Sequence, residues 1–564
     1  MVINFKNTID MKSLIYQSGT KLVLLFAAIL LITACEKNEE ETLPAPRLFK
    51  ASDIKVEAGQ TSAKIKWGVP LLSTGKALTY TVDFSTSPAF TTIAYTKVVD
   101  TAGITVTEDN IALRTTYYAR VKANAFGDQP ESKSITSSSF SLTGIQLFAP
   151  VRDTELRENS VTLRFANDAT ITSIKLTPEN GTAITIPITT ADLTAAGANA
   201  TPPGKKDITG LTGGVKYTAQ LLGGTKDKGI LTFTTLAVTN YTLKISPTDD
   251  LAATITAAAN GAVIGLNPGT YNVTALNTYI TGKTITLKST SGNPADTKVN
   301  FKEIDLEGTG AGVTLSGIEF DGTTAAAAYF LNFIGTQAAN GAAATFTNVV
   351  VDNCIVHGTT TSFLRANRGT AVKDHKITGI TVSNSVVYDM GANSSAAYYT
   401  FHLDKLEFKT LTVSKSTFYN SGAGLITANT LIGSDIPVIT VSYNTINGFG
   451  GAAKYAVLDA NTNPVNATIQ NNIIANTPRS ATVAAAAIRS SGTGSTVVFT
   501  YNNTFGLFTA VGGTTAVTIP ASLTNQTVDL GWNFATVNFT LPVGSSLRTS
   551  SSNSTALGDP RWTY

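Results

Sequence analysis

The stretch Thr248-Asp-Asp-Leu-Ala-Ala-Thr-Ile-Thr-Ala-Ala-Ala-Asn-Gly-Ala-Val-Ile-Gly-Leu-Asn-Pro-Gly-Thr-Tyr271 decides the fold of this chain. Asp249 or Asp250 can cap a short helix at its start, and Leu251 and Ile255 would share one face of that helix. A buried-type strand, Ala262-Val-Ile-Gly-Leu266, follows within a few residues. The first coil of a strand stack exposes an open edge and an apolar lumen, so this short apolar helix is predicted to be a lid.

Strands of one pattern recur after Tyr271. Each has an apolar anchor directly before a polar step, and successive anchors are 36, 31, 31, 28, 28 and 30 residues apart. A solenoid requires such a period, because each coil buries its inner face only against its neighbours. Small polar residues follow the anchors by two or three positions and predict an internal ladder, which Lys415 and Tyr443 interrupt. The anchors are Leu315, Val351, Val382, Val413, Val441, Ile469 and Phe499, and the ladder candidates are Asn353, Asn384, Asn444, Asn471, Asn472 and Asn502.

A second strand is predicted in each coil. If these strands stack, their outward side chains form one continuous face that can follow an extended polymer. The candidates are residues 362–365, 399–404, 424–427, 456–459 and 486–489.

The apolar helix, the V-I-x-L-x-P-G-T-Y strand and the repeating coils together resemble a right-handed parallel β-helix of the pectin-lyase-like superfamily, over residues 237–564. The resemblance implies a protein that handles polysaccharide. It does not choose an activity, because the fold hosts lyases, hydrolases, adhesins and inert binders. The tail Leu557-Gly-Asp-Pro-Arg-Trp562 resembles the closing motif of Bacteroidota surface β-helix proteins and is expected to cap the last coil.

Two modules of short alternating strands precede the helix, at residues 48–141 and 142–236. In Ala63-Lys-Ile-Lys-Trp67 the apolar residues alternate with lysines, as in a strand with one buried face. Leu211 precedes Tyr217 by six residues, and Ile111 precedes Tyr117 by the same distance. These features resemble fibronectin type III modules. The whole chain is therefore predicted to be all-β, with two β-sandwiches followed by the parallel β-helix and its short N-terminal capping helix.

The N-terminus resembles a bacterial lipoprotein signal. Lys21 precedes an apolar run that is short for a membrane span, and the run ends in Leu31-Ile-Thr-Ala-Cys35, which resembles a lipobox. Residues 1–34 are thus expected to be a signal peptide and Cys35 the lipidated residue. Residues 35–47 form an acidic tether, and the run Glu36-Lys-Asn-Glu-Glu-Glu41 resembles the surface-export signal of Bacteroidota lipoproteins. We expect an outer-membrane protein that faces the cell exterior; a plain membrane anchor or a secreted protein is the alternative.

Composition narrows the choice of partner. The formal net charge is +3 in 564 residues, without a concentrated basic face, which argues against nucleic acid. Two cysteines allow no disulfide framework once Cys35 carries lipid, and Cys354 lies in an apolar strand pattern typical of a core residue. A monomer is expected.

The densest polar and aromatic patch spans two consecutive repeats. In Tyr399-Thr-Phe-His-Leu-Asp404, Phe401 and Leu403 would point inward, so His402 and Asp404 would point outward together. Arg365 lies one repeat earlier on the equivalent strand. The ligand-binding candidates are Arg365, Arg368, Lys373, His375, Tyr399, His402, Asp404, Lys405 and Glu407.

Three functions remain open. The first is binding of an acidic, pectin-like polysaccharide, with Arg and Lys pairing carboxylates and Tyr stacking on sugar rings. The second is a pectate-lyase-like β-elimination, for which Arg365, Lys405 and His402 could supply the cation, base and proton donor. The third is a structural adhesin without glycan activity.

No cofactor is expected, although a lyase could use Ca²⁺. Only Asp404 and Glu407 lie near in sequence, and the sequence shows no clustered-carboxylate motif. A hydrolase of the polygalacturonase type is disfavoured, because the one Asp-Asp pair, Asp249-Asp250, falls in the helix.

Overall fold

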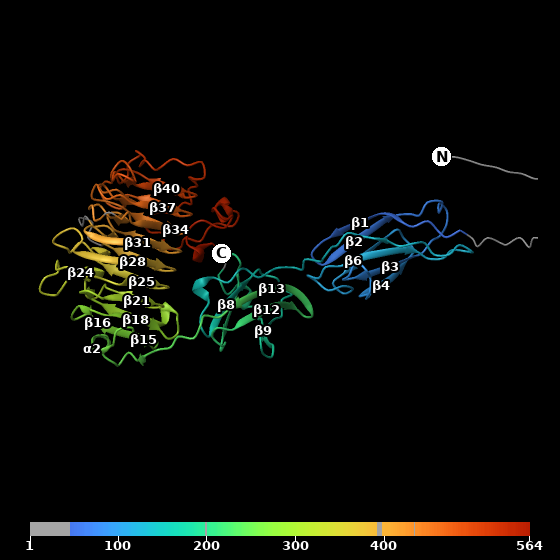
Figure 1. Ribbon diagram of the computed structural model, residues 1–564, viewed down its shortest axis with the longest axis horizontal. Coiled ribbons are helices and arrows are strands. Elements are labelled where there is room, and N and C mark those ends of the chain that lie inside the picture. Colours follow the sequence, from blue (N-terminus) through green and yellow to red (C-terminus); the bar gives the residue numbers. More distant parts are fainter. Residues whose placement is uncertain (1–45, 198–199, 392–397, 434, 564) are drawn as a thin grey trace, which may run out of the picture. The chain divides into compact units, whose positions relative to one another are not determined.

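The computed structural model describes residues 46–197, 200–391, 398–433 and 435–563. Cys35, the signal segment and nearly all of the acidic tether lie outside these residues. The described chain is almost entirely β-structure, with one α-helix, and it divides into two compact units that meet between Ile145 and Gln146 (Figure 1). No helix among the described residues is long and apolar enough to cross a membrane.

The first unit is a β-sandwich. The strand Ser62–Gly68 buries Ala63, Ile65 and Trp67 and exposes the lysines between them, as the alternation predicts. Trp67 is 5% exposed and its ring centroid lies 5.3 Å from that of Tyr80, so it is a core residue. One sheet is β1 (Ser52–Ala58), β2 (Ser62–Gly68) and β5 (Gly103–Thr107); the other is β4 (Tyr95–Val99), β3 (Tyr80–Ser85), β6 (Tyr118–Ala123) and β7 (Ile135–Thr136).

The second unit begins with another β-sandwich. Its Tyr217 hydroxyl accepts a hydrogen bond from the Thr212 amide at 2.9 Å, and in the first sandwich Tyr117 accepts one from Ala112 at 3.2 Å. In both sandwiches, therefore, the tyrosine six residues after Leu211 or Ile111 is buried, and its hydroxyl holds the segment that leads into its strand. The sheets are β10 (Ile184–Pro187), β9 (Ser173–Pro178), β12 (Lys216–Gly223) and β13 (Lys226–Thr234), and β11 (Gly204–Thr209) with β8 (Ser160–Phe165); the 3-10 turns are Asp153–Glu155 and Asp192–Thr194.

Partly buried polar bonds join this sandwich to the early coils. The Lys288 ammonium contacts Glu158 at 2.8 Å and donates to the Thr239 hydroxyl at 2.6 Å. Burial opposes ionisation of Glu158, but these bonds outweigh it and lower the pKa of Glu158. The sandwich is thus attached to the β-helix within one unit.

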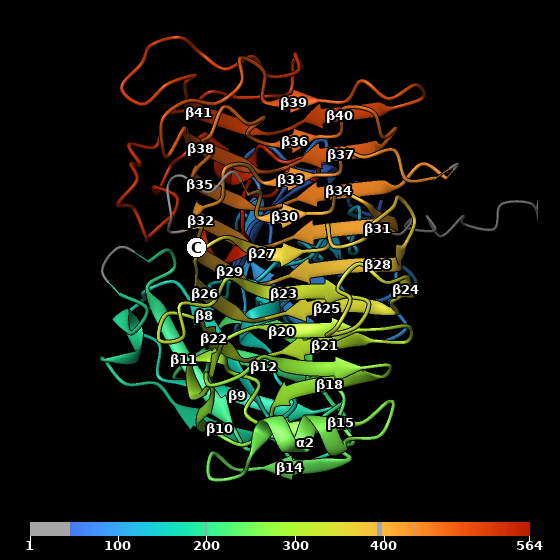
Figure 2. The ribbon, with the colours of Figure 1, turned by 90° about the vertical axis from the view of Figure 1, so that its left-hand side faces the viewer.

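Three parallel sheets build the β-helix, and each complete coil adds one strand to each of them (Figure 2). The first sheet contains β14 (Leu243–Ile245), β15 (Val263–Leu266), β18 (Thr284–Ser289), β21 (Gly312–Ser316), β25 (Asn348–Asp352), β28 (His375–Ser383), β31 (Leu406–Ser414), β34 (Val438–Ser442), β37 (Asn466–Gln470) and β40 (Thr496–Thr500), with β24 (Ala344–Thr345) beside β28. The second contains β16 (Gly269–Val273), β19 (Thr297–Phe301), β22 (Glu319–Asp321), β26 (Ile355–Thr359), β29 (Val386–Met390), β32 (Thr417–Ser421), β35 (Thr445–Phe449), β38 (Ile473–Thr477) and β41 (Asn503–Leu507). The third contains β17 (Thr278–Thr281), β20 (Ile304–Glu307), β23 (Tyr329–Ile334), β27 (Ser362–Arg365), β30 (Phe401–His402), β33 (Ile426–Thr427), β36 (Leu458–Asp459) and β39 (Ile488–Arg489).

The anchors stack in one register in the first sheet, as predicted, from Leu315 through Val351 and Val382 to Phe499. They line an apolar lumen, and Cys354 lies in it, 1% exposed. Burial raises the pKa of the Cys354 thiol to about 12, so this cysteine is a core residue as expected.

The helix α2 (Leu251–Ala257) covers the first coil. The Asp250 side chain accepts from the Ala253 amide, and Leu251 and Ile255 are buried. At the other end the Lys283 ammonium donates to the carbonyls of Ile255, Thr256 and Ala258 at 2.7–2.8 Å. A cation at the last carbonyls of a helix satisfies acceptors that have no partner within the helix and interacts favourably with the helix dipole. Lys283 therefore attaches α2 to the neighbouring coil.

The polar ladder forms at the bend between the first and second sheets, three positions after the anchors. Asn472 accepts from the Asn444 backbone and side-chain amides at 2.8 and 3.0 Å and donates to Val441 and Asn502 at 3.0 Å. Ser385 and Ser416 extend the ladder into earlier coils. The row two positions after the anchors is not part of it. That row takes positive φ after each of the seven anchors, from Gly317 to Tyr501, so Lys415 (φ 49°) and Tyr443 (φ 56°) are tolerated and interrupt nothing.

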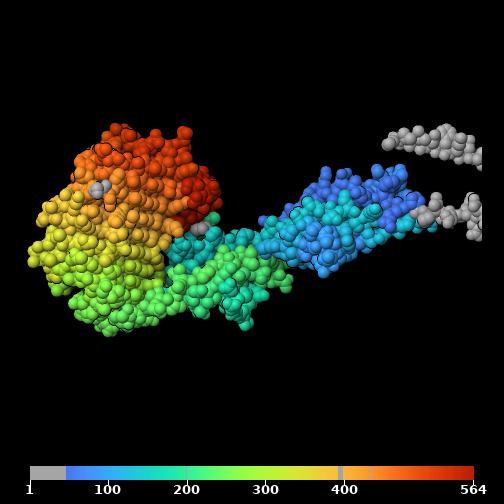
Figure 3. Space-filling model, viewed as in Figure 1, coloured from blue at the N-terminus to red at the C-terminus, as the bar shows by residue number. Residues whose placement is uncertain are grey.

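The closing motif, residues 557–562, does not cap the last coil as expected. The C-terminal segment, residues 526–563, starts at the last coil, where Gln526 pairs with Asn503 and Val528 hydrogen-bonds to the Asn503 side chain. It folds back beside the middle coils, where the Trp562 indole donates to Thr417, the Arg561 guanidinium to the Asn384 carbonyl and the Asp559 amide to Thr445 (Figure 3, dark red). Phe539 packs its ring on Tyr419, Trp532 and Trp562. The last coil is covered instead by residues 508–519, in which Val517 and Ile519 pack against the lumen core. Two 3-10 turns, Ser546–Thr549 and Pro560–Trp562, lie in the segment.

Candidate functional site

The outer face of the third sheet carries one polar row. Arg365 on β27 pairs in register with His402 on β30, so the two side chains lie on the same wall, one coil apart. Phe401 and Leu403 are buried while His402 and Asp404 are partly exposed, as the alternation predicts. Coils of a parallel sheet are about 4.8 Å apart. In register, the row is Asp305, Asn332, Arg365, His402, Thr427, Asp459 and Arg489.

Two arginines share a tyrosine on this face. The guanidinium carbons of Arg365 and Arg368 lie 4.8 and 5.4 Å from the ring centroid of Tyr329. Arg365 also donates to the Tyr329 hydroxyl and lies 5.7 Å from the Tyr398 ring. Burial, followed by the charge of Arg365, lowers the pKa of Arg368. Like charges held this close repel each other, so an anion between them would be stabilised.

Within the described residues, neither guanidinium has a carboxylate within ion-pairing distance. The far end of the same row provides an internal comparison. There the Arg489 guanidinium also lies over a tyrosine, 4.5 Å from the Tyr455 ring, but Asp459 binds it through two contacts of 2.7 and 2.9 Å. One arginine of this face is thus neutralised by the fold, while the pair at Tyr329 keeps its positive charge.

The histidine of the row is engaged by a carboxylate. His402 Nε2 lies 3.5 Å from Asp404 Oδ2, and Asp404 also accepts from the Asn429 amide and the Thr427 hydroxyl. Burial alone would raise the pKa of Asp404, but the bonds that it accepts outweigh burial and lower it. His402 Nδ1 is buried and has no hydrogen-bond partner among the described residues. The nearby Lys405 ammonium donates to the Gly369 carbonyl at 3.3 Å.

An acidic group borders the arginine pair. The Asn277 amide donates to Glu303 at 3.2 Å and to Asp305 at 2.8 Å, and the Asn332 amide donates to Asp305 at 2.7 Å. Arg368 in turn donates to Asn332 at 3.1 Å. Asp305 is 1% exposed, and burial raises its pKa; burial followed by the charge of Asp305 raises the pKa of Glu303 to about 7.

Four predicted residues lie elsewhere. His375 is fully buried at the start of β28, with Nε2 against the Ala342 carbonyl and its ring perpendicular to that of Phe346. Tyr399 is 3% exposed and donates its hydroxyl to Asp459. Glu407 is on the first sheet, where its carboxylate lies 3.5 Å from the Lys376 ammonium. Lys373 is exposed in the loop before β28. The structure therefore brings together Arg365, Arg368, His402, Asp404 and Lys405. It leaves Lys373, His375 and Glu407 outside that face, and Tyr399 is buried with its hydroxyl bound to Asp459 of the row.

Sequence reasoning missed Tyr329, Asn332, Glu303 and Asp305. An alternating pattern was the available signal for the two carboxylates. Acidic residues at 303, 305 and 307 alternate with Ile304 and Leu306, as in the other strands that form the third sheet.

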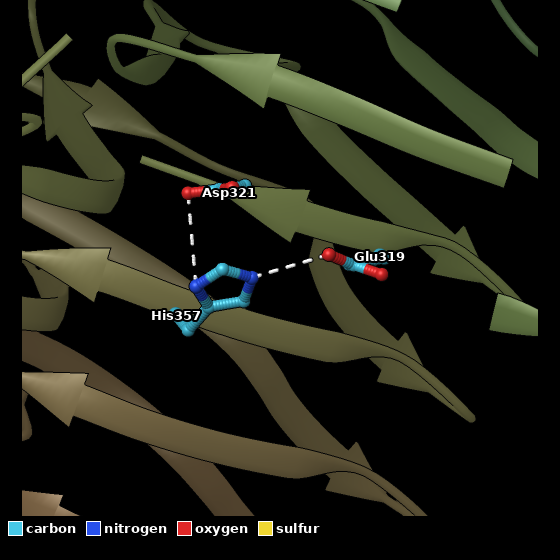
Figure 4. A group of neighbouring side chains, drawn as sticks. All are labelled: Glu319, Asp321 and His357. Carbon is cyan, nitrogen blue, oxygen red and sulfur yellow. Dashed lines mark hydrogen bonds and ion pairs between the residues drawn. The ribbon is translucent and has the colours of Figure 1, made fainter. Parts of the chain in front are cut away.

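A separate group lies on the second sheet. Glu319, Asp321 and His357 bring one ligating atom each within 4.8 Å of the others, and they are the one such group found in the described residues (Figure 4). Lys298 already bonds both carboxylates, at 3.2 and 2.6 Å, and the His357 ring stacks on Tyr388. Burial opposes ionisation of Asp321, but its hydrogen bonds outweigh burial and hold its pKa at about 2. We interpret the group as an ion-pair network in which Lys298 bridges the two carboxylates.

Comparison with known proteins adds little to this geometry. No family model matches the chain, and no curated protein matches it either. The PL6 family alginate lyase AlyGC is 18% identical over 46% of this chain and 39% of its own, with a TM-score of 0.32; a mutant of the same lyase is 16% identical over the same shares, with a TM-score of 0.33. A two-domain fibronectin type III segment of chicken tenascin is 15% identical over 32% of this chain and 97% of its own, with a TM-score of 0.16. This chain thus covers less than half of the lyase. Matches of this extent carry no argument about activity, and the fold rests on the chain's own sheets.

Proposed function

We propose that the β-helix binds an acidic, pectin-like polysaccharide along the outer face of its third sheet. The carrying observation is the arginine pair at Tyr329, which has no carboxylate partner among the described residues although Arg489, on the same face, has one. Guanidinium groups bind carboxylates through paired, charge-assisted hydrogen bonds. Tyr329 and Tyr398 supply ring surface beside them.

The remaining parts of the proposal concern delivery. Lipid on Cys35 would hold the protein in the outer membrane of a bacterium of the Bacteroidota, facing the cell exterior, as part of polysaccharide utilisation. The two sandwiches, which resemble fibronectin type III modules in sequence, would serve as spacers, and the protein would act as a monomer that does not bind nucleic acid. Palmitate labelling of wild type and Cys35→Ser tests the anchor.

Binding is tested with purified residues 36–564 against polygalacturonate, alginate and a neutral galactan. Arg365→Ala and Arg368→Ala are each expected to weaken binding of the acidic glycans about 10- to 100-fold, the value of a lost charge-assisted bond. Arg47→Ala removes an equal charge from an exposed position and should have no effect. Equal affinity for the neutral galactan would contradict the proposal.

Cleavage by β-elimination is a second candidate, favoured by the register of Arg365 and His402 on one face. It predicts an unsaturated product that absorbs in the ultraviolet and that is lost in Arg365→Ala or Lys405→Ala. Binding without an unsaturated product would indicate a binding protein and not a lyase. If the protein neither binds nor cleaves the glycans, the structural adhesin is the function that remains.

The described residues of this face include no group of three close His, Cys, Asp or Glu side chains that could hold Ca²⁺. Ca²⁺ takes six to eight oxygen ligands, and the one compact ligand group in the described chain is on the second sheet, where Lys298 holds it. We therefore assign no step to Ca²⁺.

A further inference from the structure

Among the described residues, Glu303 is the one acidic side chain beside the arginine pair that is neither fully buried nor bound by a cation. It is partly exposed directly before β20, and the hydrogen bond that it receives comes from Asn277, a neutral amide. Its neighbour Asp305, in contrast, is enclosed and accepts from two amides. Glu303 is thus the carboxyl of this face that can respond to a change in charge nearby.

The charges around Glu303 come from three coils. Lys302 and Asp305 flank it in its own coil, and Arg365 and Arg368 face it from later coils. Tyr279 faces it from the preceding coil, and Glu307 adds its charge through Asp305. With Glu303 ionised, the three cations and three carboxylates of this group balance; with Glu303 neutral, the group keeps one net positive charge.

We propose that Glu303 couples glycan binding to proton uptake: an acidic sugar bound at Arg365 and Arg368 favours the neutral Glu303 carboxyl, and ionisation of Glu303 weakens binding. The inference rests on the proposed binding function. A second negative charge close to Glu303 opposes its ionisation, and by linkage protonation must then favour the sugar by the same factor. The pKa of Glu303, raised to about 7 by burial and by Asp305, places the change near neutral pH.

The test is calorimetric titration of residues 36–564 with tetragalacturonate at pH 6, 7 and 8, in two buffers of different ionisation enthalpy. Wild type should take up a fraction of a proton at pH 7 and lose about 3- to 10-fold in affinity from pH 6 to pH 8, as expected for one unit charge several ångströms away near a protein surface. Glu303→Gln should bind at pH 8 as wild type does at pH 6, with no proton uptake. Glu179→Gln, an exposed carboxyl in the second sandwich, is the matched control.

The outcomes separate the two proposals. Binding that is independent of pH, or proton uptake that persists in Glu303→Gln, would overturn the role of Glu303 and leave the binding function intact. No binding at any pH would overturn both. Circular dichroism of each variant shows whether it is folded before it is titrated.

Discussion

The polar ladder gives a quantitative prediction about the stability of the tube. Replacing Asn472 with alanine removes a fully buried side chain that makes four hydrogen bonds of 2.8–3.0 Å. It leaves the Asn444 backbone amide unpaired in the interior, and each such orphaned group costs about 1–3 kcal/mol. With the Val441 carbonyl also deprived of a donor, we expect a loss of about 3–5 kcal/mol.

Urea unfolding followed by tryptophan fluorescence measures this loss. A Trp67→Phe background removes the one tryptophan of the first sandwich, so that Trp532 and Trp562 report on the β-helix. Asn272→Ala is the matched control, because Asn272 is exposed on the second sheet and accepts one exposed bond from Asn300. It should cost less than about 0.5 kcal/mol. If Asn472→Ala unfolds at the same urea concentration as Asn272→Ala, the ladder does not stabilise the tube as argued.

Three further predictions concern other parts of the structure. The pKa of Glu303 is raised in the folded chain, so the stability linked to its proton is present below the ordinary value of 4.5 and is lost as pH rises through about 7. Glu303→Gln should match wild type at pH 4 and exceed it by about 1–2 kcal/mol at pH 8 in thermal unfolding, after discounting for solvent screening; equal stability at pH 8 would contradict the raised pKa. Lys283→Met should uncap α2 and cost about 1–2 kcal/mol in urea unfolding, whereas Lys283→Arg should recover part of the loss. Trp562→Ala should release residues 526–563, visible as faster proteolysis there, while Trp562→Phe should keep the ring contact with Phe539 and stay protected; equal cleavage of both would show that the indole ring does not hold the segment.

The repeat period in the sequence predicted the strand register correctly. It did not predict the position of residues near a short loop that connects strands of two different sheets. The register of Leu315 through Phe499 and the pairing of Arg365 with His402 followed from strand spacing alone, since a parallel stack aligns equivalent positions. His375 was misplaced because its neighbours are polar, yet it shares its inward side with Ile377 on β28. The spacing of residues in the sequence does not show that the loop ends, and the buried strand β28 begins, at His375.

The unexpected parts involve contacts between distant segments. Arg368 meets Asn332 across 36 residues, and Lys298 reaches Glu319 and Asp321 on the next coil. The sequence contains these residues but not their distances, so the acidic border of the site and the lysine-bridged group on the second sheet could not be told apart beforehand.

The backward path of the C-terminal segment limits how this protein can evolve. Repeat arrays commonly change length when a repeat is duplicated or deleted, because each unit contacts only its neighbours. Here, duplicating a coil between Thr445 and the last strands would move the attachment points of Asp559 and Trp562 by about 4.8 Å relative to the segment's origin. The number of coils is therefore tied to the length of the returning segment, and the two could change only together.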